Sequence, residues 1–272
     1  MKVNYGGFVP LSTVDWRGRA VCTVFLRGCP LRCSYCHNAA IQTGEDIRDT
    51  GEIIALIESA RSLISGVVFS GGEPTLQKNA LIGLASAAKE KGLLVGLQTN
   101  GYFPETLESL IERRLVDRIA LDFKTRWEGY SRRLEGYGAV PRETYNSRVR
   151  QSILLCRDAL RKGSLADFEI VATIFPGNEG EVPGISKMAD GVDLVLQQGE
   201  LKRYWGDWIL SPDAGAKKSP VGLEKSSPSR PLTAEELREV ADTLGRTVRI
   251  RTREGGEEVY EGHRRRRAAC QR

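Results

Sequence analysis

The chain has 272 residues and a mass of 30.1 kDa, which suits one large domain or one domain with a small appendage. Hydrophobic residues make up 40% and charged residues 28%, and this composition excludes a disordered or collagen-like chain. The net charge is +5, but residues 264–272 contain five arginines and no acid, so the rest of the chain carries no net charge. A wholly basic surface that coats nucleic acid is therefore excluded.

No segment approaches the roughly eighteen consecutive apolar residues of a membrane span, and the start, MKVNYGGFVP, lacks an apolar stretch of signal-peptide length. We therefore expect a cytoplasmic protein without a membrane partner, and no nucleic-acid partner. The six cysteines are too few for a disulfide scaffold in a chain of this length. Three of them cluster within eight residues, which favours metal or redox chemistry in a reducing compartment.

Residues 1–200 alternate short β-rich runs with helical patterns. Near-continuous apolar runs, typical of parallel strands covered by helices, occupy Val21–Arg27, Gly66–Ser70, Leu93–Gln98, Arg118–Phe123, Phe168–Ile174 and Val192–Gln197. Helical patterns cover 51–63, 79–92 and 104–116, with Gly92 suited to a C-cap and Pro104 to a first helical position. Six β-then-α units predict an α/β fold with right-handed crossovers, either an open parallel sheet or an incomplete barrel.

The composition changes after about Gly206, so residues 1–206 form the predicted core. Residues 207–232 are rich in Ser, Pro, Lys and Gly, which indicates a linker or loose excursion. Residues 233–262 predict an appendage made of a helix, with a capping box of Thr233 and Glu236, and a hairpin around Gly255-Gly256. Residues 263–272 form a basic tail.

The segment GCPLRCSYCHN places Cys29, Cys33 and Cys36 directly after the first of these strands, in the spacing Cys-x3-Cys-x2-Cys. Three soft thiolates can hold three corners of an iron–sulfur cluster or part of a zinc site. Zinc needs a fourth ligand, and His37 would struggle to reach the same tetrahedral ion because it directly follows Cys36. A 4Fe–4S cluster would keep one iron open for a small molecule, and zinc stays the alternative.

The segment VVFSGGEPT places Gly71, Gly72 and Glu73 at the end of the second strand, the end where parallel α/β folds bind ligands. Two glycines allow a close backbone approach, and the Glu73 carboxylate suits an ammonium group. Alone, Gly-Gly-Glu-Pro is an ordinary turn. Because the cysteine loop follows the neighbouring strand, we expect both loops to cover the same mouth.

These two motifs resemble those of the radical SAM enzymes. Cys36-His37-Asn38 and the segments QTNG at 98–101 and LDFK at 121–124 resemble glycyl-radical-enzyme activases. Residues 5–200 are similar to the short activating proteins of anaerobic ribonucleoside-triphosphate reductases. The resemblance implies a partial (β/α)6 barrel of radical SAM type, with a C-terminal extension.

The resemblance also implies a site. Cys29, Cys33 and Cys36 would ligate three irons of one 4Fe–4S cluster, and the fourth iron would chelate the amino and carboxylate groups of S-adenosylmethionine (SAM). Only thirty-four residues, none of them Cys, separate Cys36 from Gly71, so we expect one cluster. Cys22 and Cys156 are predicted to be buried apolar residues.

The remaining implied residues surround SAM. Tyr35 would pack near the adenine, and Gly71, Gly72 and Glu73 would receive the methionyl ammonium. The same cofactor-binding set includes Thr99, Asn100, Asp122 and Lys124. Lys124 would reach the methionyl carboxylate, while Thr99 and Asp122 can help to hold a monovalent cation. A salt-bridged strand end is the alternative for Asp122 and Lys124, and Gln98 stands where some relatives carry an acid.

The implied reaction begins when a low-potential donor, such as ferredoxin or flavodoxin, reduces the cluster. SAM is then cleaved reductively, and the 5′-deoxyadenosyl radical takes hydrogen from a glycine Cα of a partner, a glycyl radical enzyme that we expect to be anaerobic ribonucleotide reductase. Two alternatives stay open. One is a radical SAM enzyme that acts on a small molecule or RNA base, similar to 7-carboxy-7-deazaguanine synthase or a tRNA-modifying enzyme. The other is a zinc-binding interaction module.

Overall fold

The structure is a computed structural model that describes residues 1–31, 33, 36–123, 142–199 and 230–262. The described chain forms two compact units. The first comprises residues 1–31, 36–123 and 142–170, and the second comprises residues 33, 171–199 and 230–262. Within these ranges no helix is both long and apolar enough to cross a membrane.

The strands of the first unit form a largely parallel sheet. They follow the order β3 (Ile47–Asp49), β1 (Lys2–Ser12), β2 (Val21–Leu26), β4 (Gly66–Gly71), β5 (Leu94–Thr99) and β6 (Arg118–Phe123), next to the first residues of β7 (Asp167–Ile174). Strands β2, β4, β5 and β6 pair in parallel, and β1 pairs antiparallel with β2 and β3. The α/β fold class expected from the sequence is confirmed.

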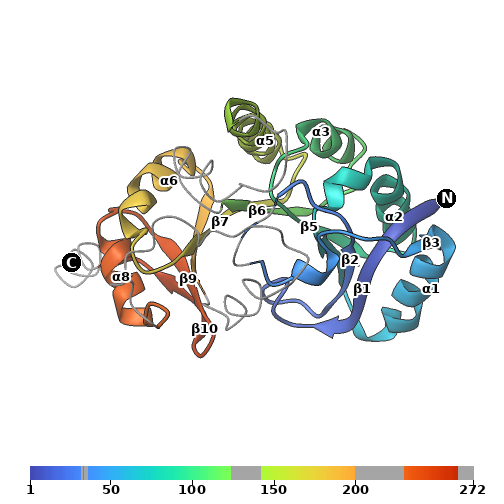
Figure 1. The fold of residues 1–272 in the computed structure, drawn as a ribbon, viewed down its shortest axis with the longest axis horizontal. Coiled ribbons are helices and arrows are strands. Elements are labelled where there is room, and N and C mark those ends of the chain that lie inside the picture. Colours follow the sequence, from blue (N-terminus) through green and yellow to red (C-terminus); the bar gives the residue numbers. More distant parts are fainter. Residues whose placement is uncertain (32, 34–35, 124–141, 200–229, 263–272) are drawn as a thin grey trace, which may run out of the picture. The chain divides into compact units, whose positions relative to one another are not determined.

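The helices of the first unit lie along one side of these strands (Figure 1). They are α1 (Thr50–Ala60), α2 (Lys78–Glu90), α3 (Pro104–Glu112) and α5 (Arg142–Arg161), with short 3-10 turns η1 (Ala39–Ile41), η2 (Arg61–Leu63) and η3 (Pro74–Gln77). Pro104 opens α3 as predicted, and Gly92 has the left-handed φ of +75° that ends α2. Cys22 and Cys156 are fully buried, also as predicted, and burial raises the pKa of Cys22 to about 12.

The second unit contains both a parallel and an antiparallel strand pair. It contains the end of β7, η4 (Glu179–Glu181), α6 (Val182–Met188), β8 (Asp193–Gln198), α8 (Ala234–Asp242), β9 (Val248–Thr252) and β10 (Gly256–Tyr260). Strand β9 runs parallel to β8 and antiparallel to β10, so the predicted hairpin extends the sheet. The capping box of Thr233 and Glu236 is present.

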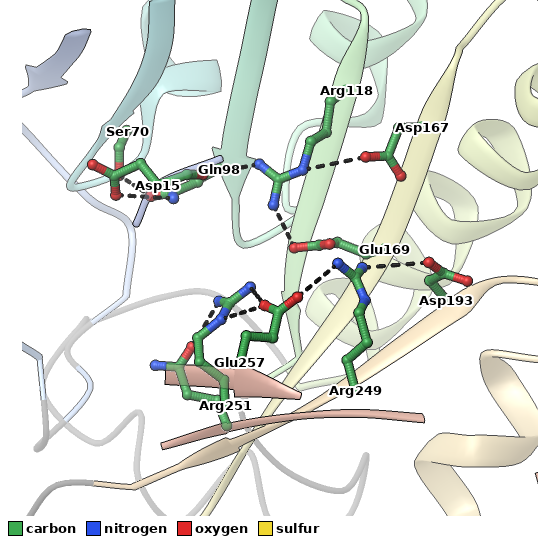
Figure 2. Close-up of polar contacts among 11 residues, drawn as sticks. Asp15, Ser70, Gln98, Arg118, Asp167, Glu169, Asp193, Arg249, Arg251 and Glu257 are labelled. Atoms are coloured by element: carbon green, nitrogen blue, oxygen red, sulfur yellow. Dashed lines mark hydrogen bonds and ion pairs between the residues drawn. The ribbon is translucent and has the colours of Figure 1, made fainter. Parts of the chain in front are cut away.

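On the strands of the second unit, charged side chains form an ion-pair network (Figure 2). Arg249 and Arg251 both contact the Glu257 carboxylate, at 3.1 and 2.7 Å, and Arg249 also contacts Asp193 at 3.4 Å. Burial favours the neutral form of Glu257, but the two guanidinium groups outweigh it and hold its pKa below the usual range. The network therefore links β8, β9 and β10 by ion pairs as well as by backbone pairing.

The predicted strands agree with the structure at β2, β4, β5, β6, β7 and β8, with ends that differ by at most one residue. The sequence did not indicate β1, because Gly6, Gly7 and Pro10 interrupt its pattern. The backbone accommodates them with irregular pairing between Tyr5 and Gly7 and between Val9 and Ser12. The predicted boundary at residue 206, most of the 207–232 linker and the 263–272 tail lie outside the described residues.

Candidate functional site

The loop that carries the cysteines leaves β2 and folds back on itself. Arg27, directly after the strand, donates hydrogen bonds to the carbonyls of Ala40 and Thr43 at 2.9 and 3.1 Å, and to that of Tyr5 on β1 at 3.1 Å. Farther along, the backbone N–H of Cys29 donates to the Gln42 carbonyl at 3.1 Å. Hydrogen bonds therefore tie the two ends of the loop together, and the three cysteines lie between Arg27 and Gln42.

The three cysteines differ in burial. Cys29 is buried, whereas Cys33 and Cys36 are half-buried. Tyr35 lies outside the described residues. In the part of the chain that the structure describes, no three His, Cys, Asp or Glu side chains gather in a group that could hold a metal ion. All three cysteines lie on the one loop that follows β2.

The glycine-rich loop after β4 packs directly against the cysteine loop. The N–H of Gly72 donates to the Leu26 carbonyl at 2.9 Å, and the N–H of Glu73 donates to the Gly28 carbonyl at 2.8 Å. A Cβ on Gly72 would lie 2.2 Å from the Gly28 oxygen and 3.2 Å from the Cys29 Cβ. Only glycine allows this approach. The cysteine loop and the glycine-rich loop are thus in direct contact, as expected for two loops that follow neighbouring strands.

Position 71 also requires glycine, for a different reason. Its φ is +133°, and a Cβ there would lie 2.2 Å from the Leu26 oxygen. Its carbonyl accepts a hydrogen bond from the Asn38 side chain at 3.2 Å, so the residue after His37 also ties the two loops together. The motif Cys36-His37-Asn38 contains Asn38 but does not by itself indicate this contact.

Glu73 is fully buried, and its carboxylate accepts hydrogen bonds from the loops around it. Its Oε1 accepts hydrogen bonds from the Thr99 hydroxyl at 2.7 Å, from the Thr75 N–H at 3.0 Å and from the Thr75 hydroxyl. Its Oε2 accepts from the Asn100 N–H at 2.7 Å. Burial raises the pKa of this carboxyl above its usual range, although each of these donors favours the charged form.

Asn100 joins the glutamate to a cysteine. Its backbone N–H binds Glu73, and its side-chain Nδ2 donates to the Cys29 sulfur at 3.8 Å. The preceding residue, Thr99, donates to Glu73 and accepts from the Gly101 N–H at 3.1 Å, so its hydroxyl is used twice. Cys29, Glu73, Thr99 and Asn100, predicted as one site, are therefore connected by hydrogen bonds.

Two further predicted residues lie on or beyond β6. Asp122 is half-buried and follows Leu121, which pairs with Thr99 of β5. By this register Asp122 lies level with Asn100 at the same edge of the sheet. Lys124 lies outside the described residues.

Comparisons with known proteins show the family of this chain. A family model described as the Radical SAM superfamily matches residues 23–180, which include both loops. This chain belongs to the radical SAM superfamily.

Individual relatives carry more specific names. A protein of Methanocaldococcus jannaschii, provisionally named a glycyl-radical enzyme activating enzyme, is 32% identical over 266 residues, which are 95% of this chain and 100% of that protein. The pyruvate formate-lyase-activating enzyme of Clostridium pasteurianum is 34% identical over 107 residues, 37% of this chain and 44% of that enzyme. A solved structure of TYW1 with a lysine-pyruvate adduct bound has a TM-score of 0.57 at 14% identity, over 90% of this chain and 80% of that chain, and shows a likeness of fold.

A row of polar residues that was not predicted from the sequence lies on this radical SAM sheet (Figure 2). The Asp15 carboxylate accepts from Thr23 of β2 at 2.7 Å and from Gln98 of β5 at 3.4 Å, and Gln98 accepts from Ser70 of β4 at 2.7 Å. The pairing register puts Thr23, Ser70 and Gln98 on one face of the sheet. The hydrogen bonds therefore hold the Gln98 amide in one orientation.

The row continues with charged residues. Arg118 of β6 donates to the Asp15 backbone carbonyl at 3.1 Å and pairs with the Glu169 carboxylate of β7 at 2.5 Å. Both side chains of this ion pair are buried. A signal for the row was present in the sequence, because β2, β4, β5, β6 and β7 each contain a polar residue that contributes to it. Apolar runs indicate the strands, whereas the row becomes visible only when the polar positions of different strands are compared.

Proposed function

We propose that this chain reductively cleaves SAM and generates a glycyl radical on a partner enzyme. Cys29, Cys33 and Cys36 hold one 4Fe–4S cluster in this proposal, and SAM binds beside it at Gly71, Gly72 and Glu73. The residues fit these groups, because three soft thiols on one loop suit iron, and Gly72 leaves room for the two loops to meet at Cys29. When bound, the cluster supplies the electron that breaks a carbon–sulfur bond of SAM, which gives methionine and a radical that takes hydrogen from the partner's glycine.

The observation that carries the proposal is the contact between the two loops. Glu73 N–H bonds Gly28 at 2.8 Å, one residue before Cys29, and Asn100 links the Glu73 carboxylate to the Cys29 sulfur. A ligand that reaches a cluster at Cys29 would thus lie next to a buried carboxylate. The four donors to that carboxylate are all neutral, so an ammonium group would supply the missing positive charge.

The finer assignments extend this proposal. Tyr35 packs near the adenine, Lys124 binds the methionyl carboxylate, and Thr99 with Asp122 holds a monovalent cation. The partner is anaerobic ribonucleoside-triphosphate reductase, and the electron donor is a ferredoxin or flavodoxin. The names of relatives support the activase class, since two of them are named for activating glycyl radical enzymes or pyruvate formate-lyase.

Electron paramagnetic resonance tests the cluster and its ligand. The full chain, reconstituted anaerobically and reduced with dithionite, should give a 4Fe–4S signal whose g-values shift when SAM is added. Cys36→Ala should abolish the signal, whereas the matched control Cys22→Ala should keep it, because Cys22 is buried in β2 away from the loop. One zinc per chain without sulfide would overturn the proposal.

A second experiment tests the partner. The reduced, SAM-loaded chain is incubated with anaerobic ribonucleotide reductase, and we expect a glycyl radical signal on the reductase together with one 5′-deoxyadenosine per radical. SAM cleavage without a radical on the reductase would leave the chemistry intact and overturn this choice of partner.

A further inference from the structure

The Asn100 carboxamide lies against the Cys29 sulfur in a buried setting. Nδ2 donates to Sγ at 3.8 Å, and the two residues are 5% and 9% exposed. The Leu31 N–H donates to the same sulfur at 3.4 Å. Of these two donors, only the Asn100 amide can be changed by substitution without moving the cysteine loop.

The orientation of this amide is determined by its surroundings. Its Oδ1 accepts the Tyr102 N–H at 3.0 Å, which leaves Nδ2 to face the sulfur. The Asn100 backbone is held on both sides, because its N–H donates to Glu73 at 2.7 Å and its carbonyl accepts from the Tyr145 hydroxyl at 3.1 Å. Every polar group of Asn100 is engaged, so the donor to sulfur is fixed in place.

We propose that Asn100 is a positioning residue that raises the reduction potential of the cluster through its hydrogen bond to the Cys29 sulfur. The inference rests on the proposed function, since it assumes a cluster ligated by Cys29. Reduction adds a negative charge that the cluster shares with its cysteine sulfurs. A donor to one of those sulfurs stabilises the reduced state more than the oxidised state, and burial strengthens the effect.

A potentiometric titration of the reconstituted full chain, followed by electron paramagnetic resonance without SAM, measures this effect. Asn100→Leu removes the donor, and we expect the ratio of reduced to oxidised cluster at a fixed ambient potential to fall about threefold. Asn100→Asp keeps an acceptor for Tyr102 but places a carboxylate oxygen at the sulfur, so the ratio should fall further. Tyr145→Phe is the matched control, because it removes a bond to the Asn100 backbone and leaves the amide in place.

The outcomes are distinct. Lower ratios in both Asn100 variants with an unchanged ratio in Tyr145→Phe support the inference. An unchanged ratio in cluster-loaded Asn100 variants overturns it, as does an equal fall in Tyr145→Phe or loss of the cluster from both Asn100 variants. If the unsubstituted chain binds no iron and sulfide, the proposed function itself fails, and the inference fails with it.

Discussion

Two glutamates, one in each unit, accept hydrogen bonds from the same kinds of donor in opposite surroundings. Glu73 accepts from the N–H and hydroxyl of Thr75, and Glu236 accepts from the N–H and hydroxyl of Thr233 at 2.7 and 3.0 Å. Yet the pKa of Glu73 is raised, whereas that of Glu236 is lowered to about 2. Hydrogen bonds of this kind therefore do not decide the charge state by themselves.

Burial and a neighbouring cation explain why the two pKa values shift in opposite directions. Glu73 is fully buried and its four donors are neutral, so desolvation dominates its pKa. Glu236 lies at the surface, and the Arg230 guanidinium beside it, at 2.7 Å, is the largest cause of its lowered pKa. The buried carboxyl belongs to the candidate site, where the ammonium group of a ligand would stabilise the charged carboxylate, as Arg230 stabilises that of Glu236. The exposed one caps a helix.

The largest effect should follow from removing the buried glutamate. Glu73→Ala leaves the N–H groups of Thr75 and Asn100 and the Thr99 hydroxyl buried without their acceptor, and we expect a loss of about 3 kcal/mol in the free energy of unfolding. Denaturant unfolding of the full chain measures it. Glu236→Ala is the matched comparison, and a loss as large as that of Glu73→Ala would remove the distinction between the two glutamates.

The glycine loop offers the next largest effect. Gly72→Ala would force a Cβ to within 2.2 Å of the Gly28 oxygen, and relieving that clash should cost about 2 kcal/mol and separate the two loops. The control is Gly83→Ala on α2, where a Cβ meets only the end of Met1 at 3.9 Å. That control should gain up to about 1 kcal/mol, since alanine favours a helix. Equal stabilities for the two variants would contradict the close packing of the loops.

Local patterns were enough to predict much of the fold. The apolar runs located β2 and β4 to β8, and cap residues such as Pro104 and Thr233 marked helix starts, because these signals lie within a few residues of one another. Strand β1 was missed because Gly6, Gly7 and Pro10 hide its pattern, and only pairing with β2 makes it a strand.

The residues of the candidate site could be predicted from the sequence, but the hydrogen bonds between them could not. The motifs identified Cys29, Glu73 and Asn100, but Asn100 lies 27 residues from Glu73 and 71 from Cys29, so their contacts depend on the folded sheet. The same holds for the polar row, where Arg118 and Glu169 are 51 residues apart. Long-range pairing in a parallel sheet is not encoded in the spacing of a single chain segment.

A smaller effect comes from the titration of Glu73. Its raised pKa means that the folded chain binds the proton more tightly than the unfolded chain, so stability should fall as the pH rises above the ordinary value of 4.5. Glu73→Gln removes this titration, and the decline above pH 4.5 should become shallower than in the unsubstituted chain. The slope of unfolding free energy against pH tests this, whatever the absolute stability of the variant. An unchanged slope would mean that burial does not dominate the pKa of Glu73.

The smallest effect, of opposite sign, belongs to Glu236. Its lowered pKa means that the folded chain favours the charged form, so its contribution to stability is present above pH 4.5 and is lost as the pH falls towards 2. Because the side chain is exposed and screened by solvent, salt should weaken the contribution further. Glu236→Gln should flatten the stability profile between pH 4.5 and 2 and leave it unchanged above that range. If Glu236→Gln instead altered the slope above pH 4.5, the sign of its titration would match that of Glu73, and the contrast between a buried and a cation-paired carboxyl would not hold.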